Sequence, residues 1–144
     1  GLVYLTPYDG VEYLFTREGF YGGWYRPTFV DVEIKGETFK DVLNEQVVHT
    51  SQFSMGVDVA DINNDAHPEI ITVDMLPSDP YILKRSLGED EYNTFYSKLR
   101  HGYNYQYARN TLQLNRGGDV FSEVGLYSGV YATDWSWAPL WMAP

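Results

Sequence analysis

The stretch GVDVADINNDAHPEIITVDM, residues 56–75, contains two signals that decide the expected fold. Four oxygen-bearing side chains follow one another at short, regular spacing between Asp61 and Glu69. The strongly β-forming run Ile70–Val73 comes directly after them. The stretch therefore predicts a strand that an acidic loop leads into.

The acidic loop has the spacing of a calcium site. Oxygen ligands at positions 1, 3 and 5, a backbone carbonyl at 7 and an acid at 9 let a short loop wrap a calcium ion. An EF-hand would also need an acid at position 12, where this chain has Thr72, and β-branched residues stand where its second helix would begin. The spacing predicts a Ca²⁺ site between two strands. Its ligands would be Asp61, Asn63, Asp65, the carbonyl of His67, and Glu69.

Ala66 departs from this pattern. Position 6 of such a loop requires a left-handed backbone, which costs on the order of 1 kcal/mol for alanine relative to glycine. A weakened calcium site is therefore one interpretation. The alternative is a polar surface turn without metal, because Asn63–Asp65 are ordinary turn residues.

Composition and charge exclude several classes of protein. The 144 residues suffice for one domain with its own core, and 44% hydrophobic and 17% aromatic content argues against disorder. The net charge of −10 would repel a phosphate backbone, so nucleic acid is not expected as a partner. Cysteine is absent, which excludes disulfides and thiolate zinc sites. The apolar segment 125–144 is too interrupted for a transmembrane helix, and the chain reads as a fragment or processed piece.

Helical signals interrupt an otherwise β-like pattern. Asp79-Pro80, with Ser78 as the other candidate cap, predicts a helix start. Apolar side chains then recur at helical spacing from Tyr92 to Leu99, and Gly102 offers an end. Outside residues 78–102 the chain alternates short β-like runs with glycine-bearing turns. Two of these turns precede Phe39 and Phe121 in similar contexts, which suggests an internal repeat of the kind found in propellers.

Several strings together resemble the FG-GAP/VCBS repeats of integrin-α-like β-propellers, in large proteins of the ASPIC/UnbV type common in Bacteroidetes. The strings lie in residues 49–56, 56–70, 73–77, 105–115 and 133–140. The resemblance spans roughly residues 28–144. In that family the last string runs into a second Asp-rich loop, but Ala143 stands where its first Asp would be, so a second metal site is not carried over.

The resemblance implies an all-β fold, a β-propeller fragment of about two to three blades with a short helical insertion at about residues 78–102. The whole chain would be part of one propeller domain. Its portions would be a first blade portion (about 1–50), the calcium-loop blade strands (51–77), the helical insert (78–110) and the next blade portion (111–144). The missing blades would lie elsewhere in the same protein or in a partner protein.

The function implied is non-enzymatic: a calcium-stabilised segment of a bacterial protein that binds a protein or glycan, or serves in assembly. Its location would be extracellular, at the cell surface or associated with the outer membrane, where millimolar calcium keeps a weak loop occupied. The alternative is a glycan-active enzyme or a carbohydrate-binding module. Paired indoles would suit sugar faces, and the candidates are Trp135 and Trp137; the alternative is that these side chains pack between blades. Acid pairs such as Asp58 with Asp61 are too common to indicate glycoside hydrolysis.

Overall fold

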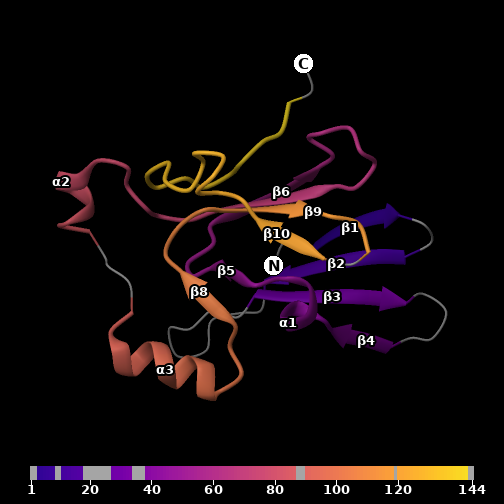
Figure 1. Cartoon of the computed structure of the whole chain (residues 1–144), viewed down its shortest axis with the longest axis horizontal. Helices are drawn as coiled ribbons and strands as arrows, with labels where there is room; N and C mark the ends of the chain where they lie inside the picture. The colour runs from indigo at the N-terminus through magenta and orange to yellow at the C-terminus, as the bar shows by residue number, and fades with distance from the viewer. Residues whose placement is uncertain are drawn as a thin grey trace. The chain divides into compact units, whose positions relative to one another are not determined.

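The structure is a computed structural model that describes residues 3–8, 11–17, 27–33, 38–86, 90–118 and 120–142. The chain divides into two compact units, Gly1–Gln46 and Val47–Pro144. Figure 1 shows the helices and strands of both units along the chain.

The first unit is a four-stranded antiparallel meander in the order β1-β2-β3-β4. Strands that follow one another in sequence pair, with Leu5 opposite Leu14, and Val32 opposite Phe39. A one-turn helix that includes the buried Leu43 closes the unit. The elements are β1 (Val3–Tyr8), β2 (Val11–Arg17), β3 (Pro27–Glu33), β4 (Thr38–Asp41) and α1 (Leu43–Gln46).

The second unit is built on an antiparallel sheet in the order β10-β9-β7-β6. Strand β7 lies inside this sheet, paired with β6 and β9, and four of its five residues are buried. Its β-branched run suits that position because both of its faces are covered. The strands are β6 (Gly56–Ala60), β7 (Glu69–Val73), β9 (Thr111–Asn115) and β10 (Phe121–Glu123). The core of this sheet includes Ile70, Val73, Leu112 and Phe121.

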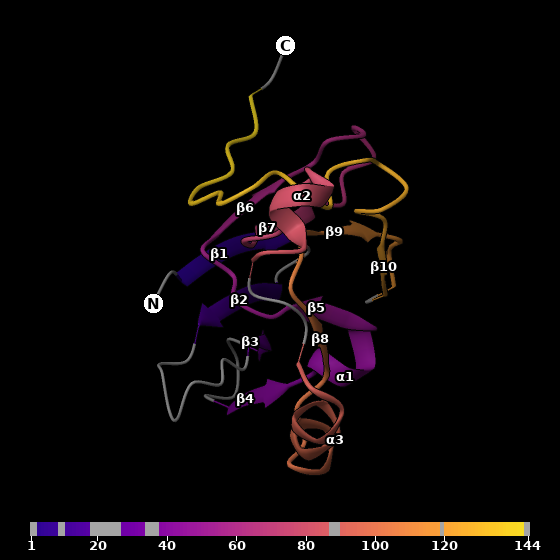
Figure 2. The same ribbon diagram turned by 90° about the vertical axis from the view of Figure 1, so that its left-hand side faces the viewer.

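A second, smaller sheet in this unit is parallel. Strand β5 (His49–Ser51) pairs with β8 (Tyr105–Tyr107), and His49 lies opposite Tyr105. Between these strands in sequence come the β6–β7 hairpin and two helices. The helices are α2 (Pro80–Leu83) and α3 (Tyr92–Arg100), and α3 lies near β8 in both ribbon views (Figures 1 and 2).

The two helices are held in place by different interactions. Asp79 caps α2, since its carboxylate accepts hydrogen bonds from the backbone N–H groups of Tyr81 and Ile82. Glu91, before α3, makes no such side-chain bond. Helix α3 is instead anchored by Lys98, which is buried and forms an ion pair with Asp90 at 2.6 Å.

The segment after β10 contains no strand or helix among its described residues and runs beside β6 at residues 137–141. A Cβ atom on Gly56 would lie 2.4 Å from the carbonyl oxygen of Trp137, so glycine permits this close approach. The backbone N–H of Trp141 donates to the Asp58 carboxylate at 2.7 Å. In the described part of the chain, no helix is long and apolar enough to cross a membrane.

The expected all-β propeller fragment is wrong. A propeller repeats similar four-stranded sheets around an axis. The described residues instead form one antiparallel meander, one antiparallel sheet, a separate parallel pair and three helices. Of the two glycine-bearing turns that suggested a repeat, residues 34–37 and 119 lie outside the described residues, and the strands on either side of each turn form antiparallel pairs, β3–β4 and β9–β10. Such hairpins occur in many β architectures, so their likeness does not establish blades.

Candidate functional site

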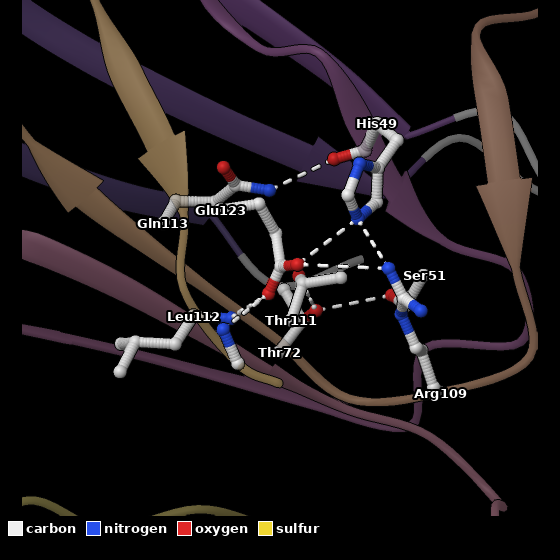
Figure 3. A network of polar contacts seen from close by, with 9 residues as sticks. His49, Ser51, Thr72, Arg109, Thr111, Leu112, Gln113 and Glu123 are labelled. Carbon is white, nitrogen blue, oxygen red and sulfur yellow. Dashed lines mark hydrogen bonds and ion pairs between the residues drawn. The ribbon is translucent and has the colours of Figure 1, made fainter. Parts of the chain in front are cut away.

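The second unit brings three charged or ionisable side chains together from distant parts of the chain. His49 comes from β5, Glu123 from β10, and Arg109 from the connection between β8 and β9 (Figure 3). The Nε2 atom of His49 lies 3.1 Å from Glu123 Oε2 and 3.0 Å from a terminal nitrogen of Arg109. Arg109 and Glu123 approach to 3.7 Å. We call His49, Arg109 and Glu123 the His–Arg–Glu cluster.

Glu123 is the fixed member of the cluster, with a side chain that is only 5% exposed. Its Oε1 atom accepts hydrogen bonds from the backbone N–H groups of Gly125 and Leu112. Burial by itself raises the pKa of this carboxyl, but the hydrogen bonds from His49 and these N–H groups outweigh it and lower the pKa below its ordinary value. Glu123 is therefore a carboxylate at neutral pH.

The other two members keep limited access to solvent. The side chain of His49 is 15% exposed and that of Arg109 21% exposed. The Arg109 guanidinium lies 5.2 Å from the centre of the Tyr107 ring, and the His49 ring meets the same tyrosine edge-on. The Nε atom of Arg109 is buried without a hydrogen-bond partner. These side chains can thus reach a small polar molecule.

A line of buried hydroxyl groups lies beside the cluster. Thr72 bridges Ser51 and Thr111, at 3.0 Å and 2.7 Å. Gln113 donates from Nε2 to the backbone oxygen of His49 at 2.8 Å, while its Oε1 is buried without a partner. These polar groups link β5, β7 and β9 and hold the backbone of His49 in place (Figure 3).

The structure places the predicted calcium ligands in the loop between β6 and β7. Asp61, Asn63 and Asp65 are exposed, and His67 is half-buried. The loop is closed by its own hydrogen bonds: Asp61 accepts from the N–H groups of Asp65 and Ala66. Asp65 accepts from the N–H of His67, and this hydrogen bond is the largest cause of the lowered pKa of Asp65. Ala66 has φ 68°, the left-handed conformation that the sequence predicts there.

Glu69 differs from the other loop acids because it is fully buried. Its Oε2 atom accepts from the N–H of Ile62 at 2.9 Å, whereas its Oε1 has no hydrogen-bond partner. Burial raises its pKa, and the negative charges of Asp65 and Asp61 raise it further, against the hydrogen-bonding effect of the Ile62 and Asn115 backbone groups.

The expected metal-binding character of the chain is corrected in one respect. Among the described residues, no three His, Cys, Asp or Glu side chains are grouped so that they could hold a metal ion. Oxygen atoms of Asp61, Asn63 and Asp65 accept hydrogen bonds from N–H groups of the loop itself. The identity of the five predicted ligands and of the ion itself stays a prediction.

Trp135 and Trp137 lie in the segment after β10, 61% and 64% exposed. Their backbone follows a bend at Asp134, which has φ 65°. Both indoles are accessible, and their role in binding a ligand stays a prediction.

Sequence reasoning missed the His–Arg–Glu cluster. Its members are 60 and 74 positions away from His49 along the chain, so no local spacing points to them. A signal was present only at Glu123, an acid in a strand that also carries the apolar Phe121.

Comparisons with known proteins point away from the repeat family. No protein-family model and no solved structure matches the chain. One curated protein, "Putative gamma-glutamylcyclotransferase YkqA" of Bacillus subtilis (strain 168), is 49% identical over 43 residues. The match covers 30% of this chain and 16% of that protein.

These findings correct two expectations. The FG-GAP/VCBS resemblance is wrong, because the comparison leads to a different family and no repeat model matches. The expected non-enzymatic binding role is also overturned, since the similar protein is named as an enzyme. Short strings around turns and strand ends, on which the resemblance depended, are shared by unrelated folds.

Proposed function

We propose that this chain is part of an enzyme that cyclises γ-glutamyl groups. The observation that carries the proposal is the 49% identity over 43 residues to a protein named as a γ-glutamylcyclotransferase. The match covers 16% of that protein, so the activity is argued from the short match and from the chemistry of the described residues. The His–Arg–Glu cluster also supports the proposal, because its side chains could exchange a proton and bind a carboxylate.

The reaction needs no cofactor. The α-amine of the γ-glutamyl group must lose a proton, attack the γ-carbonyl carbon and form a ring C–N bond. The original amide C–N bond then breaks, and the leaving amine takes up a proton. The products are a five-membered lactam and a free amine, so atoms and electrons balance without water or an oxidant.

The His–Arg–Glu cluster offers side chains for these steps. His49 would take the proton from the α-ammonium group and return it to the leaving amine as a general base and acid. The Glu123 carboxylate, 3.1 Å from Nε2, would stabilise the imidazolium formed in between. Arg109 would bind the α-carboxylate of the substrate, because a guanidinium matches a carboxylate in shape and charge.

The test is incubation of the protein with a γ-glutamyl arylamide, followed by measurement of both 5-oxoproline and glutamate. Cyclisation gives 5-oxoproline, whereas hydrolysis gives glutamate. An N-acetylated substrate is the matched control, because it lacks the attacking amine and can only be hydrolysed. Absence of 5-oxoproline, or equal turnover of both substrates, would contradict the proposal.

Variants locate the activity within the chain. His49→Gln is expected to lower the cyclisation rate by about 100-fold or more, the usual size of a general acid–base contribution. His101→Gln is the control, since His101 is exposed at the end of α3. An enzyme that keeps full activity in His49→Gln would move the active site away from this cluster.

We propose separately that the loop between β6 and β7 binds Ca²⁺ as a structural ion. What supports this is Glu69, whose carboxyl is fully buried and whose pKa is raised by burial and by the negative charges of Asp65 and Asp61. The ion would be held by Asp61, Asn63, Asp65, the carbonyl of His67, and Glu69. A chelator would then lower the melting temperature and added calcium restore it, and no shift with either would contradict the proposal. Occupancy at millimolar calcium fits an extracellular location.

A further inference from the structure

The Nε2 atom of His49 has two neighbours that make opposite demands on it. Glu123 Oε2 lies at 3.1 Å and a terminal nitrogen of Arg109 at 3.0 Å, so both are within hydrogen-bond distance of the same atom. A carboxylate can only accept a hydrogen bond, and a guanidinium can only donate one. The single ring nitrogen can therefore satisfy one neighbour at a time.

The proton on Nε2 decides which neighbour is satisfied. With a proton, Nε2 donates to Glu123 and turns an N–H toward the N–H groups of Arg109. Without a proton, its lone pair accepts from Arg109 and faces the carboxylate oxygen. A ring that is protonated on both nitrogens also carries a positive charge 3.0 Å from the guanidinium, which repels Arg109.

The surroundings determine which partner moves. The charged and titratable side chains that the described contacts bring to the ring are Glu123 on β10, Arg109 after β8, and Tyr107 on β8. Glu123 is fixed by two backbone N–H groups, and Gln113 holds the backbone of His49. Arg109 is the partly exposed member, and besides His49 it contacts Glu123 at 3.7 Å and the centre of the Tyr107 ring at 5.2 Å, both beyond hydrogen-bond distance.

We propose that His49 is a proton-operated switch for Arg109. When Nε2 is unprotonated, the ring accepts a hydrogen bond from the guanidinium and keeps Arg109 inside the cluster. When Nε2 is protonated, the ring pairs with Glu123 and releases Arg109 toward solvent. The charge of one imidazole thus controls whether a guanidinium is available in this part of the second unit. The switch does not depend on the proposed cyclisation, because its readouts are a tautomer and a side-chain position.

The test is an NMR pH titration of the full ¹⁵N-labelled chain, in which the protonation of both His49 ring nitrogens is read directly from their ¹⁵N signals. Where the ring is neutral, we expect its proton on Nδ1 and the Arg109 Nη–H signals protected from exchange. Where both ring nitrogens are protonated, we expect the protection of the Arg109 signals to be lost. A neutral ring protonated on Nε2, or Arg109 protection that is equal in both states of the ring, would overturn the proposal.

Two variants assign the effect. His49→Gln removes the titrating group, so the protection of Arg109 should no longer depend on pH. His101→Gln leaves the cluster intact and should behave as the wild type. If His49→Gln does not fold, Arg109→Met serves instead: it removes the donor to Nε2 and is expected to shift the neutral His49 ring toward the Nε2–H tautomer, which donates to Glu123. An unchanged tautomer in that variant would overturn the proposal.

Discussion

Replacing Asp74 by alanine tests how much a buried carboxylate stabilises the second unit. Asp74 is fully buried at the end of β7, and its side chain accepts hydrogen bonds from the backbone N–H groups of Gln52, Phe53 and Met75. No cation balances it in these contacts. These three N–H groups are the donors that the described residues offer to its side chain, so the loss of their acceptor should dominate the effect of the substitution.

The magnitude follows from counting the donors left without a partner. The N–H of Gln52 also donates to the carbonyl of Tyr107 and keeps that bond. The N–H groups of Phe53 and Met75 lose their acceptor, at about 1–3 kcal/mol each. Both residues are only half-buried, so hydrogen bonds to water reduce the free-energy cost of their unpaired N–H groups. Removal of a buried carboxylate, which is costly to desolvate, reduces the net loss of stability further. We expect a net loss of about 2–4 kcal/mol of unfolding free energy.

The assay is urea denaturation of the wild type, Asp74→Ala and Asp79→Ala at neutral pH. Asp79 is the matched control, since its carboxylate also accepts from two backbone N–H groups but is exposed. Its loss should cost about 1 kcal/mol, the usual value for an N-cap. If Asp74→Ala costs no more than Asp79→Ala, burial of these hydrogen bonds is not what stabilises this region.

The pH dependence of Asp74→Asn gives a second measurement. Burial raises the pKa of Asp74 in the folded state above its ordinary value of 3.8. The folded protein therefore binds this proton at a higher pH than the unfolded chain does. The resulting contribution to stability is fully present below pH 3.8 and is lost as the pH rises through the folded pKa. Acidification from neutral pH should favour the wild type over Asp74→Asn, and a constant difference would refute the reasoning.

Three further substitutions make specific predictions. Gly56→Ala should destabilise by about 1–3 kcal/mol and increase proteolysis near Trp137, because the new Cβ would lie 2.4 Å from the Trp137 carbonyl oxygen; an unchanged digestion pattern would contradict this. Ala66→Gly should raise unfolding free energy by up to about 1 kcal/mol, since φ 68° strains alanine, and a lower melting temperature would contradict it. The wild type should lose stability as the pH falls through the folded pKa of Glu123, which lies below 4.5. Glu123→Gln should not show this loss, and equal acid profiles of the two proteins in urea titrations would argue against the prediction.

Local elements of the fold could be predicted because their causes are local. Ile70–Val73 forms most of β7, as a run of β-branched residues before an acidic loop predicts. Helix α2 begins at Pro80 behind the Asp79 cap for reasons visible in two adjacent residues. The left-handed backbone at Ala66 follows from its place in the loop.

The arrangement of these elements could not be predicted in the same way. A hairpin such as β9–β10 looks the same in sequence whether it belongs to a propeller blade or to another sheet. Strands β5 and β8 contain three residues each, too few for a periodic signal, and their pairing depends on contacts across the second unit. His49 and Arg109 come together only because these strands pair. The cluster was therefore invisible to reasoning from spacing.

The parallel pairing of β5 with β8 has a kinetic consequence. His49 lies opposite Tyr105, about 56 residues later in the chain, and closing a loop of that length costs roughly 3–4 kcal/mol of entropy before any contact repays it. The β6–β7 hairpin closes over a much shorter distance. We expect the pair to be absent from the folding transition state, with φ-values near zero at its residues. Substitutions there should then speed unfolding and leave the folding rate nearly unchanged.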